Sequence, residues 1–212
     1  MELYAAMTTT PTTRFYRPDP VPSEVLHRIL DAARHAPSGG NRQGWRVVVV
    51  TDAALRRKLR DLYLPPWREY VERLVARAGG RRSRSLERSD EFAEHLHDVP
   101  VHLVVCVDVG ALTITDDELG RPSIVGGASI YPFVQNILLG CRNEGLGAAI
   151  TTMLCRREPE VKDLLAIPPE YAMACLVAVG YADEDRRPSR ISRRDVSAIA
   201  FRDTFDGGPF EA

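Results

Sequence analysis

A short polar loop between the end of a helix and a buried strand is the feature that most constrains how this chain folds. Residues 36–50 read APSGGNRQGWRVVVV. The residue before a proline is pushed out of the helical region, so the Ala-Pro step predicts a helix end. The Gly-Gly pair lets the backbone turn at positive φ or approach a ligand closely. The β-branched run Val47–Val50 is typical of a strand.

The same loop has the chemistry to hold a flat ligand. Ser38, Asn41 and Gln43 carry hydroxyl and amide groups, which donate and accept hydrogen bonds without net charge. An ordinary polar connection between a helix and a strand explains these residue types equally well. The residue types alone therefore leave both interpretations open.

Apolar periodicity and end signals predict helices before and after this loop. Apolar positions of 23–36 fall on one helical face, with Ser23 as the expected N-cap and Ala36 as the expected end. Asp52 is expected to begin a second helix. Glu158 followed by a proline is expected to begin another one.

Two nearly continuous apolar runs, at 101–107 and 172–179, predict strands that are buried on both faces. The uncharged segment 124–141 contains glycine, serine, proline and amide side chains, so its second half predicts a helix buried in protein rather than in lipid. Irregular alternation of helices and strands predicts an α+β fold. With 212 residues, 44% of them apolar, we expect a single domain over 1–212.

Charge and cysteine content bound the environment of the protein. The 28 basic and 29 acidic residues nearly cancel, which argues against nucleic acid as a partner. The four cysteines are widely spaced and match no zinc-binding pattern, so no metal site is expected. Their spacing and the lack of a secretory signal favour a cytoplasmic protein that has no membrane partner.

Two segments look peripheral to the core. The segment 63–98 contains the arginine-dense stretch Arg73–Arg88, which predicts either a solvated loop or a lid. The segment from about 183 to 212 is polar and lacks core periodicity until Val196–Phe201, so it needs a partner to hold it.

These motifs resemble those of the FMN-dependent nitroreductases. The polar loop matches the family's A-P-S-(G)-x-N-x-Q-P-W segment, except that Gly44 stands in place of the usual proline. Further similar segments follow in the family's order: PDPVP at 18–22, GGASIYPFVQN at 126–136, EGLGAAITT at 144–152, and an arginine-rich segment near Ser192. The resemblance therefore covers most of the chain.

The resemblance implies a fold and an assembly. We expect a nitroreductase-like central mixed sheet wrapped by helices, in an intertwined homodimer with a C-terminal arm over about 183–212 and a lid excursion over about 63–98. Each flavin is expected to lie at the dimer interface. The apolar helix around Tyr131–Leu139 is expected to form part of the contact between subunits.

The resemblance also implies an FMN-dependent oxidoreductase with NAD(P)H as transient reductant. In this family the flavin carries the chemistry, so no catalytic side chain is expected. A ping-pong hydride transfer to nitroaromatics, quinones or similar small planar acceptors is the expected reaction. Two alternatives on the same scaffold are a flavin-dependent reductive dehalogenase, suggested by Glu69-Tyr70, and a non-catalytic flavin-binding protein.

Residue matches to the family indicate where the ring of FMN would bind. The ring is expected to contact the polar loop at one edge and the segment Ile150–Thr152 beside N5, where a backbone N–H stabilises the reduced flavin. Tyr63, Trp67 and Tyr70 are the expected substrate or lid residues. The full set expected to contact the ring is Pro37, Ser38, Gly39, Asn41, Gln43, Ile150, Thr151 and Thr152.

The expected phosphate site departs from the family pattern R-x-S-x-(R/K)-x-F. Thr10 stands at the arginine position, Thr12 at the serine position and Arg14 at the second basic position. Loss of one charge-assisted donor weakens binding by about ten-fold or more. The tail arginines Arg190, Arg193 and Arg194 match the other basic side of the family's phosphate site. We expect Arg14, the Arg193/Arg194 pair and the threonine hydroxyls to suffice.

Overall fold

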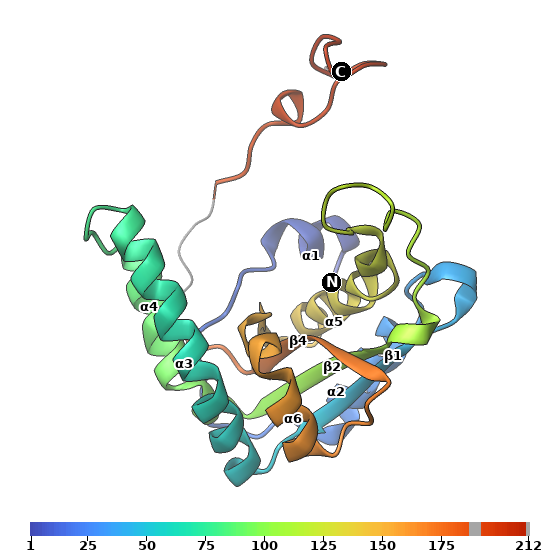
Figure 1. The fold of residues 1–212 in the computed structure, drawn as a ribbon. Helices are drawn as coiled ribbons and strands as arrows, with labels where there is room; N and C mark the ends of the chain where they lie inside the picture. Colours follow the sequence, from blue (N-terminus) through green and yellow to red (C-terminus); the bar gives the residue numbers. More distant parts are fainter. Residues whose placement is uncertain (187–191, 211–212) are drawn as a thin grey trace.

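A four-stranded antiparallel sheet in the order β1-β2-β4-β3 forms the centre of the molecule (Figure 1). The structure, a computed structural model, describes residues 1–186 and 192–210. The strands are β1 (Trp45–Val50), β2 (Val101–Asp108), β3 (Gly147–Thr151) and β4 (Tyr171–Gly180). The strands predicted at 47–50, 101–107 and 172–179 are thus confirmed, each with slightly wider bounds.

Apolar layers cover both faces of the sheet. Leu103 and Val105 of β2 pack into a layer with α2 (Ser23–Ala33) and α5 (Tyr131–Asn143). Val104 and Cys106 face the opposite layer, which contains side chains of α3, α4 and α6. Because successive strand residues point to opposite faces, only a continuous apolar run can bury β2 on both sides. The remaining helices are α1 (Leu3–Thr9), α3 (Ala53–Arg77), α4 (Arg84–Glu94) and α6 (Glu158–Leu165).

The N-terminal segment lines the free edge of β3. Thr12 forms a parallel bridge with Ala148, and the Thr13 N–H donates to the Ala148 carbonyl at 2.9 Å. Among the described residues, this bridge adds a parallel pairing to a sheet whose strands otherwise pair antiparallel. The predicted α+β class is confirmed.

The ends of α2 differ from the prediction. The helix begins at Ser23 with Pro22 as the N-cap, and the Ser23 hydroxyl makes no capping hydrogen bond. It ends at Ala33 rather than Ala36, because the N–H groups of His35 and Ala36 bond carbonyls three residues back, in a tighter turn. The chain thus leaves the α-helical conformation before it reaches the proline.

The arginine-dense stretch Arg73–Arg88 is not a loop. The helix α3 is capped by Asp52, as predicted, but continues through Pro65 and Pro66 to Arg77. A short turn with positive φ at two glycines follows, and α4 then begins with the Ser83 hydroxyl accepting the Leu86 N–H at 3.2 Å. The interpretation as a solvated loop is wrong, because burial of apolar α3 side chains against the sheet outweighs the loss of two proline N–H donors. Figure 1 shows the resulting hairpin beside the sheet.

The C-terminal segment 192–210 lies apart from the body of the molecule (Figure 1). Its hydrogen bonds within the described chain stay inside the segment, which folds back on itself through a bridge between Phe201 and Pro209. Arg190 lies outside the described residues. In the described part of the chain no helix combines the length and apolarity needed to cross a membrane.

Candidate functional site

Internal hydrogen bonds give the polar loop its shape. The Ser38 hydroxyl accepts the Gln43 N–H at 3.1 Å, and the Gln43 amide donates to Asn41 Oδ1 at 3.1 Å. Asn41 and Gln43 have φ angles of 55° and 49°, and Gly40 has 58°. Positive φ at non-glycine residues costs roughly 1–3 kcal/mol, and such strain clusters at functional sites. The loop is exposed and offers its amide groups to solvent or to a ligand.

The segment between β2 and α5 supports this loop from outside. The Gly39 N–H donates to the Ser129 hydroxyl at 3.0 Å, and the Arg42 guanidinium donates to the Thr113 hydroxyl at 3.0 Å. A Cβ at Gly44 would lie 2.7 Å from the Ala111 Cβ. Close packing therefore explains why this chain has glycine where the pattern has proline.

The motif residue Trp45 serves packing. Its ring is buried and stacks on Phe133 of α5, with centroids 4.9 Å apart. This contact fixes the start of β1, and with it the end of the polar loop, on the core.

The end of β3 forms the second part of the predicted site. Ile150 is 40% exposed, Thr151 is half-buried and Thr152 is exposed. Thr151 Oγ1 lies 3.2 Å from the Tyr63 hydroxyl of α3. The N-terminal segment pairs with β3 only as far as Ala148 within the described chain, so the backbone of the last β3 residues is open on that edge.

The three aromatic residues predicted as lid or substrate contacts form a row along α3. Tyr63 and Trp67 stack at 6.0 Å, and Trp67 and Tyr70 lie 5.7 Å apart. Tyr63 is 2% exposed and Tyr70 is 41% exposed. The row thus leads from Thr151 in the interior to solvent, with Tyr63 placed to orient Thr151 and Tyr70 placed to meet a molecule from outside.

Arg14 lies at the inner end of this row. Burial lowers its pKa, and the charges of Tyr16, Arg88 and Tyr63 act on it as well. Its guanidinium forms no hydrogen bond or ion pair with other side chains of residues 1–186 and 192–210. A half-buried cation without a counter-charge is poised to receive an anion or a polar acceptor.

The structure does not bring all predicted residues together. Arg193 and Arg194 are exposed and belong to the C-terminal segment, which lies apart from the body of the molecule (Figure 1). The polar loop precedes β1 at one edge of the sheet, whereas Thr151 ends β3 at the other edge. Three strand spacings of about 4.8 Å put the two edges about 14 Å apart. A single chain therefore holds the two segments that are predicted to bind the ring at separate places.

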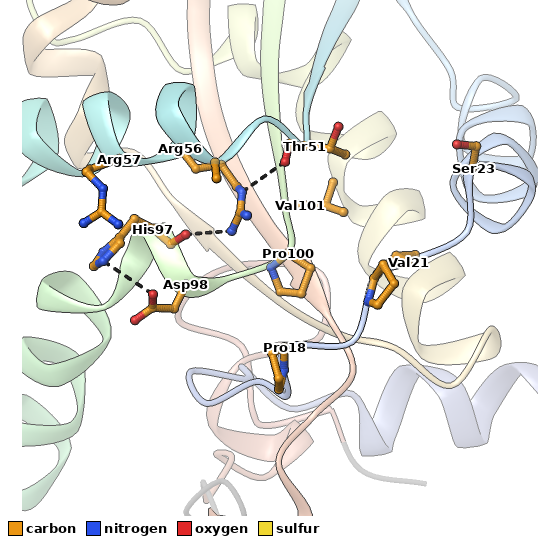
Figure 2. A pocket seen from close by; sticks show the side chains of 12 residues that line it. Pro18, Val21, Ser23, Thr51, Arg56, Arg57, His97, Asp98, Pro100 and Val101 are labelled. Carbon is orange, nitrogen blue, oxygen red and sulfur yellow. Dashed lines mark hydrogen bonds and ion pairs between the residues drawn. The ribbon is translucent and has the colours of Figure 1, made fainter.

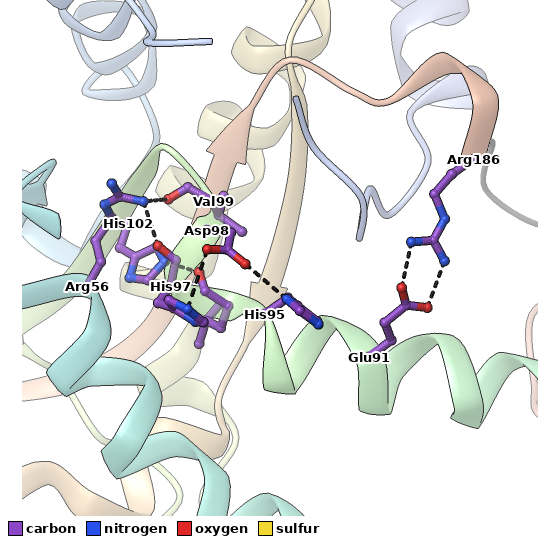
Figure 3. A network of polar contacts seen from close by, with 9 residues as sticks. Arg56, Glu91, His95, His97, Asp98, Val99, His102 and Arg186 are labelled. Atoms are coloured by element: carbon purple, nitrogen blue, oxygen red, sulfur yellow. Dashed lines mark hydrogen bonds and ion pairs between the residues drawn. The ribbon is translucent and has the colours of Figure 1, made fainter. Parts of the chain in front are cut away.

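A polar network beside the predicted site has no signal in the sequence. Arg56, His97 and Asp98 line a cavity of about 460 Å³ (Figure 2). Arg56 donates to the carbonyls of His97 and Val99, each at 2.6 Å. Asp98 contacts the imidazoles of His95 and His97 (Figure 3). Because Arg56 uses its donors on main-chain oxygens, its role here is structural.

A smaller cavity of about 240 Å³ contains Arg14. On its wall Arg186 forms two hydrogen bonds with Glu91, at 2.6 and 2.7 Å (Figure 3). The Arg186 guanidinium also lies 3.5 Å from the Phe15 ring centroid. The hydrogen bonds from Arg186 lower the pKa of Glu91. This clasp ties the chain that follows β4 to α4, and sequence reasoning missed it because the partners are far apart in the chain.

Comparisons with known proteins agree with this geometry. The sequence model of the nitroreductase family matches residues 8–181. A protein named NADH dehydrogenase from Thermus thermophilus is 29% identical, over 83% of this chain and 84% of its own length. A 4-nitrobenzoate reductase from Pseudomonas putida is 25% identical, over 81% of this chain and 82% of its own length. The solved structure of oxidized iodotyrosine deiodinase bound to FMN and 3-iodo-L-tyrosine has a TM-score of 0.72 and 25% identity, and the match covers 96% of this chain and 100% of that one.

The matched range includes the polar loop, the α3–α4 hairpin and the end of β3, but not the tail arginines. The names of the relatives confirm the predicted oxidoreductase class. The chain therefore belongs to the nitroreductase family.

Proposed function

We propose that this chain is an FMN-dependent NAD(P)H oxidoreductase that transfers hydride in a ping-pong cycle to nitroaromatic, quinone or similar planar acceptors. The observation that carries the proposal is the unpaired, half-buried Arg14 beside the Tyr63–Thr151 hydroxyl pair. The FMN named in the deiodinase structure and the NADH and nitrobenzoate in the names of the relatives support it.

The residues present fit FMN. Arg14 offers a cation that has no counter-charge within the described residues. The polar loop offers uncharged donors and acceptors, which suit the polar edge of a flavin ring. The last residues of β3 offer open backbone N–H groups on the sheet edge. The phosphate of FMN requires a cation, the pyrimidine edge of the ring requires amide groups, and N5 requires a backbone N–H group.

A homodimer brings the separated segments onto one flavin. In this arrangement the polar loop of one copy meets the β3 end of the other. Large apolar side chains on the C-terminal segment are exposed, including Phe205 at 86% and Ile199 at 64%. Apolar exposure of this kind is typical of an interface surface. Tyr131, at the start of the helix expected in the contact, is also exposed.

The chain's own residues bind FMN, orient the groups around it and shield the acceptor from water. FMN, when bound, supplies the redox chemistry by accepting a hydride from NAD(P)H and passing it to the acceptor. The Tyr63 hydroxyl fixes the Thr151 side chain, and this contact holds the β3 end in place. Trp67 and Tyr70, with their rings tilted by 46°, offer the acceptor an aromatic surface that excludes water. Four free cysteines agree with a cytoplasmic location.

The similarity to iodotyrosine deiodinase favours a reductive dehalogenase as the second candidate. Glu69 is the carboxylate that would grip the ammonium of an amino-acid substrate. Here Arg156 donates to it at 2.7 Å and Arg73 at 3.3 Å, so its charge is already balanced. This pairing disfavours an amino-acid zwitterion and favours acceptors without an ammonium group.

Anaerobic reduction of the FMN-loaded protein tests the proposal. NADH or NADPH is expected to bleach the flavin absorbance near about 450 nm, and 4-nitrobenzoate or a quinone is expected to restore it. Restoration by 3-iodotyrosine alone would favour the dehalogenase. If neither nucleotide bleaches the bound FMN, the remaining candidate is a non-catalytic flavin-binding protein.

A matched pair of variants tests the role of Arg14 in binding FMN. Arg14→Gln is expected to raise the FMN Kd about ten-fold or more, because it removes a charge-assisted donor. Arg17→Gln is the control, since Arg17 is exposed and paired with Asp19. Equal FMN affinity in the two variants would contradict the assignment of Arg14.

A further inference from the structure

The end of α1 carries no cation where the family pattern has an arginine. Thr8, Thr9 and Thr10 occupy this end, and each hydroxyl donates back to a carbonyl four residues earlier, at 2.6 to 2.7 Å. Their oxygens remain free to accept hydrogen bonds, but they bring no charge. A phosphate group needs charge-assisted donors from elsewhere.

Arg142 reaches this end of α1 from the last turn of α5. Its Nη2 donates to the Thr9 hydroxyl at 3.3 Å. Its Nε is buried and has no hydrogen-bond partner within the described residues. The buried Nε is closed to solvent, but Nη1 makes no hydrogen bond within the described residues, so the guanidinium keeps a donor for an anion.

The surrounding chain places Arg142 at the predicted phosphate site. The N-terminal amino group donates to Asn143 Oδ1 at 2.9 Å, which holds α1 against the end of α5. The chain then passes from α5 to β3, where Thr12 pairs with Ala148. Arg142 therefore contacts Thr9 where α1 meets α5, and Thr10 and Thr12 follow along the chain toward the start of β3.

We propose that Arg142 supplies to the FMN phosphate the positive charge that Thr10 lacks. The inference rests on the proposed function, since it concerns the cofactor of that site. A guanidinium arriving from α5 replaces one arriving from the N-terminal segment, while Thr12 keeps the hydroxyl of the pattern. Although threonine stands at position 10 in place of the arginine, the phosphate then still meets a cation, which comes from α5.

A purely structural role for Arg142 makes a different prediction. If the guanidinium only fastens α1 to α5, its loss loosens the contact between these helices and affects FMN and riboflavin alike. Riboflavin has the same ring as FMN but no phosphate. The ratio of the two dissociation constants therefore isolates the contact to phosphate.

The experiment measures flavin binding to the full-length chain, freed of flavin, by fluorescence titration with FMN and with riboflavin. Arg142→Gln is expected to raise the FMN Kd about ten-fold or more and to leave the riboflavin Kd unchanged. The double variant Thr10→Arg with Arg142→Gln is expected to regain FMN affinity. Arg28→Gln is the control, because Arg28 is exposed and pairs with Glu144, the residue that follows α5.

Two outcomes would overturn the assignment of Arg142 while leaving the proposed function intact: FMN affinity unchanged in Arg142→Gln, or equal losses for FMN and riboflavin without rescue by Thr10→Arg. A wild-type protein that binds neither flavin would overturn the proposed function, and the assignment with it.

Discussion

The indole of Trp45 lies nearly parallel to the Phe133 ring, with an interplanar angle of 7°. Both rings are buried between the sheet and α5. Because truncation leaves a large cavity, Trp45→Ala is expected to lower the free energy of unfolding by about 3–5 kcal/mol, and Trp45→Phe by less than half of that. Urea unfolding of the two variants measures this difference. Equal stability of the alanine and phenylalanine variants would show that the stack contributes little.

His102 gives the fold a dependence on pH. It is fully buried, its Nε2 lies 2.8 Å from the Leu96 carbonyl, and its Nδ1 has no partner within the described chain. Burial lowers its pKa to about 4. The unfolded chain, with a pKa of about 6.5, then binds more protons between these values. Stability is therefore full above about pH 6.5 and falls by up to about 3 kcal/mol as the pH drops toward the folded pKa.

Urea midpoints at pH 7.5 and pH 5 measure this effect. The variant His102→Gln keeps a donor for the Leu96 carbonyl but does not titrate, so its two midpoints are expected to lie closer together than those of the wild type. His27→Gln, on the exposed side of α2, is the control and is expected to keep the wild-type difference. A wild-type midpoint that rises on acidification would refute the role of His102.

At the residue scale, the sequence was informative where function depends on neighbours in the chain. Ser38, Asn41 and Gln43 were predicted as one polar loop, and their mutual hydrogen bonds confirm that they form a unit. Arg142 and Thr9 meet across 133 residues. No local pattern predicts such a contact, because it depends on how helices pack rather than on what each helix contains.

At the element scale, the α3–α4 hairpin shows where propensity misleads. Pro65-Pro66 and an arginine-dense stretch both argue against a helix, yet α3 runs through them. The reason is tertiary, since Tyr63, Leu64 and Val71 are buried against the sheet and its neighbours. In contrast, α6 was predicted from its proline in the first turn, a signal that is local.

Asp90 joins the two helices of this hairpin. It accepts the Trp67 indole N–H at 2.9 Å and also pairs with Arg82. Asp90→Ala is expected to weaken the closed hairpin by about 1 kcal/mol, which corresponds to about five-fold faster hydrogen exchange in α4. If the hairpin is the lid, the acceptor KM rises while the FMN Kd stays constant.

Hydrogen exchange with mass spectrometry and steady-state kinetics provide the two readouts. Glu72→Ala is the control, because Glu72 is exposed on α3 and no ion pair of it is found in the described chain. Faster exchange in Asp90→Ala without any change in KM would show that the hairpin does not act as a lid.

At the scale of the whole molecule, the sheet order decides what one subunit can do alone. The polar loop and the β3 end flank opposite edges of the sheet, with β2 and β4 between them. The sequence gives the type of both segments but not their separation, because strand order depends on long-range pairing. A second copy brings its polar loop next to the β3 end of the first only if the two sheet edges face each other across an interface.

The C-terminal segment offers the test of this arrangement. Truncation after Asp195 removes the exposed apolar side chains but keeps Arg193 and Arg194, so it separates dimer contacts from phosphate contacts. Both apolar layers of the body come from residues up to 181, so the truncated chain is expected to fold, with an unchanged far-UV circular dichroism spectrum. Light scattering after size exclusion is expected to give a dimer for the full chain and a monomer for the truncated one at micromolar concentration. Because one flavin needs both copies, FMN affinity is expected to fall together with the dimer, and a truncated monomer that still binds FMN at full strength would refute the shared site.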